Sequence, residues 1–195
     1  SEPVAAAPPP AGRAPPLILS VGILHPRKGH DVLLAALAGI AALDWRAVIV
    51  GRHHDPAHAA ALARQVAAPP LAGRVRLAGE VPQAELDGLY ARATLFALAT
   101  RYEGYGIVFD EALRHGLPIV TCRTGAVPET VPAEAGLLVP PDDAPALTTA
   151  LRRMLCEEGL RARMAARALQ AGARRPRWTE TAAIMGRVLD AVAAG

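Results

Sequence analysis

Six short apolar runs, separated by segments with helical spacing, constrain the fold of this chain more than any other feature. The runs are between four and seven residues long, and they do not alternate apolar with polar residues as strands with one exposed face would. They lie at residues 17–22, 45–51, 74–79, 94–99, 117–122 and 136–140. Strands that are buried on both faces and alternate with helices predict a parallel sheet covered by helices on both sides.

The limits of this domain follow from where the pattern starts and stops. Residues 1–16 are rich in Pro and Ala without a periodic pattern, so we expect a linker or a disordered N-terminal end. After Asp142 the chain has helical segments with no further strand between them. We therefore predict a single doubly wound, Rossmann-like α/β domain over residues 17–177, with a parallel sheet of about six strands, followed by a C-terminal helix over residues 178–195.

Basic residues are distributed unevenly between the two cationic types. The chain has 21 Lys and Arg residues, and Lys28 is its only lysine. We attribute the excess of Arg to a GC-rich genome, with a nucleic-acid surface as the weaker alternative. Aromatic residues make up only 4% of the chain, which leaves few rings for base stacking, so we predict no nucleic-acid partner.

Features of secreted and membrane-spanning proteins are not found in the sequence. Cys122 and Cys156 are too few for a disulfide framework, and we expect both to be reduced thiols. We find no signal peptide and no apolar run of about 18 residues or more. These observations predict a cytoplasmic protein.

The segment that follows the first apolar run, SVGILHPRKGHD, indicates an anion site. It contains neither the glycine fingerprint of dinucleotide-binding folds nor a P-loop. It has instead Gly22, a turn at Pro26, and the pair Arg27-Lys28 just before a predicted helix. A cation beside a helix N-terminus at the carboxyl end of a strand can hold an anion. Because the single lysine stands here, and a compact ammonium suits a phosphate, we favour a phosphate site over a solvated basic turn.

A second candidate site lies in the stretch EGYGIVFDE, after the apolar run 94–99. We expect its helix to begin near Tyr105 or Gly106, so that the glycines leave backbone N–H groups open to a ligand. Glu103 precedes these amides and Glu111 lies on the helix, and carboxylates accept hydrogen bonds from sugar hydroxyls. Phosphate and sugar contacts together predict a nucleotide-sugar pocket. A helix-start anion with a surface glutamate, and a glycosidase carboxylate pair, are the weaker alternatives.

These residues carry a resemblance to a known family. The E-x7-E pattern around Gly-Tyr-Gly, followed by EALRHGLPIV, resembles the nucleotide-sugar half of the retaining GT-B glycosyltransferases, in particular glycosyltransferase family 4 (group 1). Five further segments occur in that family's usual order and extend over most of the chain. They are VGILHPRKGHDVLLAAL, AVIVG, RVRLAGEVPQAELDGLYARA, GAVPETV and AGLLVPPDD. The resemblance implies one half of a GT-B fold, namely its C-terminal donor-binding domain.

The resemblance also implies roles for individual residues. Glu111 would hold the ribose hydroxyls, Glu103 the hydroxyls of the donor sugar, and Lys28 the diphosphate. The base would rest near residues 80–82. The predicted donor-binding residues are Gly22, Arg27, Lys28, Arg52, Val81, Glu103, Gly104, Tyr105, Gly106, Ile107 and Glu111, of which Glu103 and Lys28 are expected to be catalytic. The implied reaction transfers a glycosyl group from a UDP- or GDP-sugar with retention, without a required metal or cofactor.

The chain departs from the family pattern in two respects. Ile23 stands where the family usually has Arg, so we expect Arg27 or another cation to replace that phosphate contact. Family members also carry an N-terminal domain that binds the acceptor, whether glycan, lipid or small molecule, and only residues 1–16 precede the first predicted strand here. We therefore expect either an excised half of an enzyme or a chain that works with a separate partner. In both cases it would be inactive in transfer alone, and its segment 178–195 would pack on that other domain. A non-catalytic nucleotide or nucleotide-sugar binding module is the alternative.

Other sequence features receive structural interpretations. The loop with His53, His54, Asp55 and His58 resembles a metal cluster, but we favour an exposed loop in which Asp55 caps the next helix and Pro56 is its first residue. The arginines between residues 152 and 177 are expected to form a solvated face. The alternative interpretation of these arginines is peripheral contact with the inner face of a membrane. His115 is expected to be structural.

Overall fold

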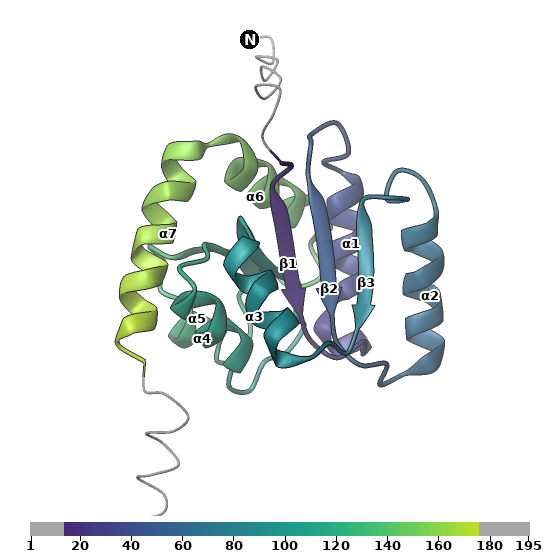
Figure 1. Cartoon of the computed structure of the whole chain (residues 1–195), viewed down its shortest axis with the longest axis horizontal. Helices are drawn as coiled ribbons and strands as arrows, with labels where there is room; N and C mark the ends of the chain where they lie inside the picture. Colours follow the sequence, from purple (N-terminus) through teal and green to yellow (C-terminus); the bar gives the residue numbers. More distant parts are fainter. Residues whose placement is uncertain (1–13, 176–195) are drawn as a thin grey trace, which may run out of the picture.

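A parallel six-stranded sheet forms the centre of the computed structural model, which describes residues 14–175. The strands are β1 (Leu17–Val21), β2 (Arg46–Val50), β3 (Val75–Gly79), β4 (Leu95–Leu98), β5 (Ile119–Cys122) and β6 (Gly136–Val139). Their spatial order is β3-β2-β1-β4-β5-β6. Figure 1 labels the first three, β3, β2 and β1, side by side. In this order, typical of Rossmann folds, the direction of winding reverses between β1 and β4. The predicted fold class and the predicted strands are confirmed.

Helices cover both faces of this sheet. They are α1 (His30–Ala38), α2 (Pro56–Ala67), α3 (Gln83–Arg92), α4 (Ile107–Arg114), α5 (Val127–Thr130), α6 (Ala144–Cys156) and α7 (Glu158–Ala173), with the short 3-10 helix η1 (Pro26–Lys28). Helices α1, α2 and α6 pack on one face, and α3, α4 and α5 pack on the other (Figure 1). Helix α7 contributes to both cores, with Met164 on the α6 side and Ala168 on the α4 side. The sheet therefore separates two apolar cores.

Burial on both faces explains why the central strand β4 is continuously apolar in sequence. In β4, Leu95 and Ala97 belong to the core on the α1 side, whereas Phe96 and Leu98 belong to the core on the α4 side. All four side chains are fully buried. Each position of this strand therefore requires an apolar side chain, because a polar one would lose its hydration.

Helical spacing of apolar residues extends over residues 31–43 and predicts a helix of that length, but the helix is shorter in the structure. α1 ends at Ala38, and Gly39 is its C-cap. The following residues turn back, so that the indole N–H of Trp45 donates to the carbonyl of Ile40 at 2.9 Å inside the core. Gly39 has a low helix propensity and ends the helix at a point where the apolar pattern alone would continue it.

The predicted terminal segments lie largely outside the described residues. Of the predicted linker, residues 14–16 are described, and the carbonyl of Pro16 already accepts a hydrogen bond from the Arg46 amide at 2.9 Å. The predicted helix over residues 178–195 lies outside the described range. Among the helices within that range, none is long and apolar enough to span a membrane.

His30, the first residue of α1, is a polar side chain inside the core. Its side chain is fully buried, and neither ring nitrogen has a hydrogen-bond partner among the described residues. Burial lowers the pKa of His30 to about 4, and the neighbouring His58 and Lys28 lower it as well. The imidazole is therefore neutral in the folded protein at pH values at which the unfolded chain protonates it.

We predict that the folded protein loses stability on acidification because of His30. Between pH 7 and pH 5 the unfolded chain takes up a proton at this residue and the folded protein does not, so its contribution to the free energy of unfolding falls by about 2 kcal/mol. Denaturant unfolding at the two pH values measures the change. His30→Leu should remove most of this dependence, and the exposed control His54→Gln should keep it. Equal pH dependence in all three proteins would contradict the assignment.

Candidate functional site

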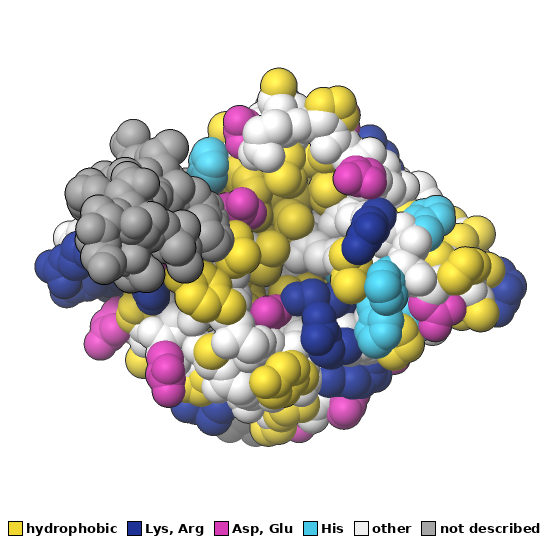
Figure 2. All heavy atoms as spheres, turned by 90° about the horizontal axis from the view of Figure 1, so that it is seen from below, with side chains coloured by type: hydrophobic (Ala, Val, Ile, Leu, Met, Phe, Trp, Pro, Cys, Tyr) yellow, Lys and Arg dark blue, Asp and Glu magenta, His cyan; other side chains and the backbone are white. Residues whose placement is uncertain are grey.

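A cavity of about 560 Å³ opens at the carboxyl ends of β1, β2 and β4. Figure 2 views this end of the molecule, where Lys, Arg and His side chains gather beside an apolar hollow. The winding of the sheet reverses here, which is where doubly wound sheets bind ligands. The cavity is lined by Val21, Gly22, Ile23, Arg27, Lys28, Val50, Gly51, Arg52, Glu80, Val81, Leu86, Glu103, Tyr105, Gly106, Ile107 and Val108.

The cavity brings together most of the predicted donor-binding residues. Gly104 and Glu111 are the two that do not line it: Gly104 is exposed, and Glu111 lies one helical turn beyond Ile107 on α4. The sequence did not predict the apolar wall, which consists of Val21, Val50, Leu86 and Val108. These side chains come from four separate elements, and no sequence motif joins them.

Lys28 and Glu103 form an ion pair in the wall of the cavity. The Nζ atom of Lys28 donates to Oε2 of Glu103 at 2.6 Å, and the two side chains are only 11% and 13% exposed. Removing one partner of such a pair leaves an uncompensated charge in a poorly hydrated place. From the sequence we expected the two side chains to contact different parts of a ligand. The two side chains instead contact each other. A ligand that binds Lys28 would therefore weaken the contact that Lys28 makes with Glu103, and a ligand that binds Glu103 would do the same.

The position of Lys28 depends on a tight turn. His25 caps η1, since its Nδ1 accepts a hydrogen bond from the Arg27 amide at 3.0 Å. Gly29 then adopts a φ of +62°, and a Cβ atom there would lie 1.9 Å from the carbonyl oxygen of Ala99. Only glycine permits both the left-handed backbone and this close approach. The turn thereby brings Lys28 against the end of β4.

We predict that Gly29→Ala lowers the free energy of unfolding by more than the roughly 1–2 kcal/mol that left-handed backbone strain alone costs. The additional loss comes from the collision with the Ala99 oxygen. Gly73→Ala is the matched control, because Gly73 has a φ of +73° and no heavy atom within 4 Å of an added Cβ. Denaturant unfolding of the two variants separates collision from strain. Equal losses would show that the close approach is unimportant.

A second close approach fixes the loop that carries Glu103. A Cβ atom at Gly125 would lie 2.2 Å from the carbonyl oxygen of Glu103. The amide of Ala126 donates to the same oxygen at 2.9 Å. Thr130 Oγ1 donates to the carbonyl of Tyr105 at 3.1 Å. The residues around α5 therefore hold both ends of the segment between Glu103 and Tyr105.

Glu111 is held by a tyrosine that the sequence analysis missed. The hydroxyl of Tyr90 donates to Oε2 of Glu111 at 2.9 Å. The Tyr90 ring is buried and stacks on His115, with ring centroids 5.0 Å apart, in agreement with the structural role predicted for His115. Burial, and then the charge of Glu111, raise the pKa of Tyr90 well above its usual range. Tyr90 therefore remains a neutral donor that orients the carboxylate.

Two arginines add positive charge to the cavity. Arg27 and Arg52 are exposed lining residues, and the structure shows no ion pair between either of them and a described carboxylate. Ile23 lines the same cavity with an apolar side chain. Glu103 neutralises Lys28, and the two guanidinium groups outnumber the one remaining lining carboxylate, the exposed Glu80. The cavity lining is therefore positive on balance, which suits an anion.

The histidine-rich loop after β2 caps a helix. Asp55 Oδ1 accepts hydrogen bonds from the amides of Ala57 and His58 at 3.0 and 3.1 Å, and Pro56 is the first residue of α2. The predicted cap is thus confirmed. Within residues 14–175, no group of three or more His, Cys, Asp or Glu side chains is placed to hold a metal ion.

The remaining predicted surface features agree with the structure in part. Arg152, Arg153 and Arg163 are exposed on α6 and α7, as expected for a solvated face. The Arg161 side chain is only 18% exposed, however, and donates to the carbonyls of Met154 and Leu155. Cys122 is buried in β5 and Cys156 is exposed at the end of α6, and both are free. Burial raises the pKa of the Cys122 thiol to about 11, so it stays protonated at neutral pH.

Comparison with known proteins identifies relatives of this chain. Residues 15–157 match the model of the family described as Glycosyl transferases group 1. The GDP-mannose-dependent alpha-(1-6)-phosphatidylinositol monomannoside mannosyltransferase of Mycolicibacterium smegmatis is 33% identical over 152 residues, which cover 73% of this chain and 39% of that protein. The D-inositol 3-phosphate glycosyltransferase of Acidothermus cellulolyticus is 33% identical over 190 residues, which cover 91% of this chain and 41% of that protein.

Solved structures show the same architecture. Sucrose-phosphate synthase from Thermosynechococcus elongatus superposes with a TM-score of 0.81 at 30% identity, over 92% of this chain and 46% of that one. Anabaena HepE, solved in complex with UDP and glucose, superposes with a TM-score of 0.80 over 93% of this chain and 49% of that one, and at 22% identity the likeness shows the fold alone. The chain spans about two fifths of the length of the curated relatives named above.

Proposed function

Because the chain belongs to the glycosyl transferases group 1 family, we propose that it is the donor-binding part of a retaining GT-B glycosyltransferase of family 4. In this proposal it binds a UDP- or GDP-linked sugar, and the sugar passes to a hydroxyl of a glycan, lipid or small-molecule acceptor. The named curated relatives are more than twice as long as the region they share with this chain. We therefore assign the acceptor to a further domain.

The observation that carries the proposal is the Lys28–Glu103 pair at the wall of a positively charged cavity. The ammonium supports a contact with the diphosphate, and the carboxylate, 2.6 Å away, supports a contact with hydroxyls of the attached sugar. A nucleoside-diphosphate sugar presents both groups next to each other. A free phosphate or a free sugar would engage only one member of the pair.

The start of α4 adds backbone donors to this cavity. Gly106 caps the helix without a side-chain hydrogen bond, which leaves the first amides of α4 for a ligand. The amides of Tyr105, Gly106 and Ile107 thus supplement Lys28 at the phosphates and the sugar. Glu111, held by Tyr90, is assigned to the ribose hydroxyls, and the base is assigned to the loop at Val81.

In the proposed reaction, the bond between the anomeric carbon and the diphosphate oxygen breaks, and the diphosphate leaves with the electron pair. The acceptor oxygen forms its bond to the same face of the anomeric carbon and passes its proton to the departing diphosphate oxygen, so configuration is retained. Lys28 and the positive end of α4 stabilise the negative charge that develops on the leaving group. The proposal requires no metal ion or cofactor.

A non-catalytic nucleotide-binding module is the second candidate. It is favoured by Ile23, an apolar lining residue at the position where the family usually has Arg. It is also favoured by the ion pair in which Glu103 neutralises Lys28. To separate the candidates, the amino-terminal half of the Mycolicibacterium smegmatis relative can be joined to residues 14–195 and tested for sugar transfer with a donor that the chain binds. Transfer that ceases in Lys28→Met supports the enzyme. A fusion that folds and binds the donor without transfer supports the module.

We predict that Glu103→Gln separates the binding of nucleotide from the binding of sugar. The change removes the negative charge beside the diphosphate, so affinity for UDP or GDP should be retained or rise. The extra affinity for the corresponding nucleotide sugar should fall by about 10-fold, because a charged acceptor is worth more than a neutral amide. Calorimetric titration measures both affinities, with the exposed Glu129→Gln as control. An unchanged preference for the sugar-bearing ligand would contradict the role of Glu103.

Peripheral contact with the cytoplasmic face of a membrane is a further part of the proposal. It is supported by the exposed Arg152, Arg153 and Arg163 on neighbouring helices, because arginines attract anionic lipid headgroups. Sedimentation with anionic vesicles, compared with neutral vesicles, tests it.

A further inference from the structure

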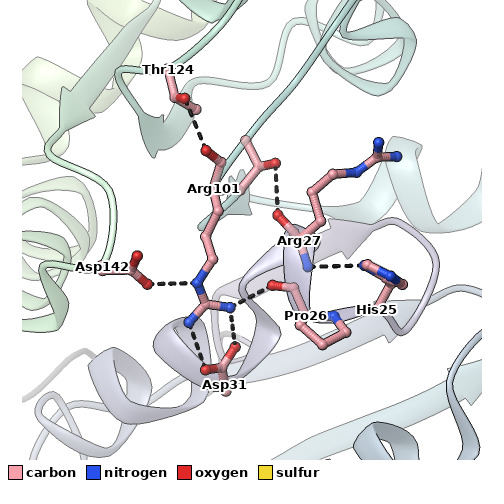
Figure 3. A network of polar contacts seen from close by, with 8 residues as sticks. His25, Pro26, Arg27, Asp31, Arg101, Thr124 and Asp142 are labelled. Carbon is pink, nitrogen blue, oxygen red and sulfur yellow. Dashed lines mark hydrogen bonds and ion pairs between the residues drawn. The ribbon is translucent and has the colours of Figure 1, made fainter.

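Arg101 lies outside the cavity lining, in the loop between β4 and α4, and its side chain is the centre of a polar network (Figure 3). Its terminal nitrogens donate to the two carboxylate oxygens of Asp31 at 3.0 and 2.8 Å. Its Nε atom donates to Asp142 at 2.7 Å, and one terminal nitrogen also donates to the carbonyl of Pro26. A planar guanidinium with several partners fixes their relative orientation in a way that a single contact cannot.

The backbone around Arg101 continues this network. The Arg101 amide donates to the carbonyl of Arg27 at 2.8 Å, and Thr100 Oγ1 approaches the same oxygen at 3.3 Å. Thr124 Oγ1 donates to the Arg101 carbonyl at 3.0 Å. Arg101 therefore joins the loops that follow β1, β4, β5 and β6 at one edge of the sheet (Figure 3).

Asp142 contributes to this network in an unfavourable backbone conformation. Its φ is +58°, and it is the only non-glycine residue with a positive φ among residues 14–175. Glycine would adopt this conformation at less cost, but it would remove the carboxylate that contacts Arg101. The carboxylate contact with Arg101 therefore stands at a position whose backbone conformation glycine would adopt at less cost.

The Arg101 network is connected to the Lys28–Glu103 ion pair through the backbone segments that carry these two residues. Pro26 and Arg27, whose carbonyls accept from Arg101, belong with Lys28 to η1. Glu103 follows Arg101 by two residues in the same loop. Arg101 thus holds the two segments from which the paired side chains project, without itself lining the cavity.

We propose that Arg101 is a positioning residue that sets the contact between Lys28 and Glu103. Its loss frees η1 from the loop after β4, so the ammonium and the carboxylate no longer meet at the cavity wall. The geometric part of this inference is independent of the ligand. Its consequence for binding rests on the proposed function: without Arg101, affinity for a nucleoside diphosphate falls although the side chain does not touch the ligand.

The single lysine gives a direct test of the geometric part. NMR of the whole chain labelled with 13C,15N-lysine reports the side chain of Lys28 alone, since it is the only lysine. In the wild type we expect an ammonium signal protected from solvent exchange by Glu103, and Glu103→Gln should abolish that protection. Arg101→Met and Asp31→Asn should shift the signal toward that of Glu103→Gln. Arg76→Met, which removes an exposed ion pair with Glu85, should leave it unchanged.

The inference is overturned if folded Arg101→Met retains the wild-type Lys28 signal and its protection. A variant that fails to fold is replaced by Asp31→Asn, which removes the negative charge and one of the two oxygens that accept from Arg101, and the same criterion applies. A Lys28 signal that moves equally in Arg76→Met also overturns it, because the effect would then follow from the loss of any arginine.

Calorimetric titration with UDP and GDP tests the consequence for binding. Arg101→Met should lower the affinity by about 10-fold or more, comparable with the loss of a charged hydrogen bond in the site, and Arg101→Lys should recover only part of it. Lower thermal stability with wild-type affinity would show a merely structural role and would refute the binding consequence. If the wild type binds neither nucleotide, the proposed function fails, and the Lys28 spectrum still decides the positioning role.

Discussion

Replacing Lys28 by methionine is expected to abolish nucleoside diphosphate binding at concentrations at which the wild type is saturated. The change removes the ammonium and leaves the carboxylate of Glu103, which is 13% exposed, without its partner. That carboxylate then repels the diphosphate. Truncating one member of a buried charge pair costs about 2–5 kcal/mol, which corresponds to a loss of affinity of roughly 30-fold to several thousand-fold.

Two further variants serve as controls for the effect of Lys28→Met. Arg64→Met removes a positive charge from an exposed position on α2, and its affinity should stay within about threefold of the wild type because the charge is remote and screened. The double variant Lys28→Met/Glu103→Gln removes the unpaired carboxylate, so it should recover stability but not affinity. Calorimetric titration and thermal unfolding report the two quantities. Wild-type affinity in folded Lys28→Met would exclude it from the binding site.

Replacing Glu111 by glutamine is expected to lower affinity for a ribonucleoside diphosphate by roughly 10- to 100-fold, the range for a hydrogen bond to a charged group. The carboxylate accepts from the hydroxyl of Tyr90 at 2.9 Å, which holds one oxygen and leaves the other for a ribose hydroxyl. The loss should be accompanied by a loss of discrimination: the wild type should prefer the ribonucleotide over its 2′-deoxy analogue, and Glu111→Gln should bind both alike.

Comparing the ribonucleotide with its 2′-deoxy analogue separates a lost contact with the ribose from a structural disturbance of the site. A structural effect would weaken both ligands equally and preserve the preference of the wild type. The exposed Glu134→Gln, in the segment between α5 and β6, serves as the charge-matched control. Equal affinity of the wild type for the two ligands would contradict the assignment of Glu111, whatever the variant does.

The fold was predictable because its strands are buried on both faces. Leu95–Leu98 carries four apolar side chains that point alternately into two cores, and such a run admits few interpretations in a chain with alternating helical segments. The start of α2 was also predictable, because Asp55 is a favoured N-cap residue and Pro56 a favoured first helical residue. The end of α1 was misplaced because the apolar pattern continues past Gly39 while the backbone does not.

The candidate residues were predictable where a motif placed them together, and their contacts were not. Lys28 and Glu103 are 75 residues apart, and their ion pair depends on the turn at Gly29 and on the loop held by Gly125. Likewise, no sequence pattern joins Tyr90 to Glu111. These contacts exist only after the sheet has brought the carboxyl ends of its strands to one edge, so they follow from tertiary structure rather than from spacing.

The central claim is that the cavity at the ends of β1, β2 and β4 binds a nucleoside-diphosphate sugar. The most direct measurement is calorimetric titration of the chain with UDP, GDP and their sugar conjugates. We predict saturable binding of at least one of them at a single site, weakened in both Lys28→Met and Glu111→Gln. Binding of none of these ligands, or binding that is unchanged in both variants, would contradict the claim.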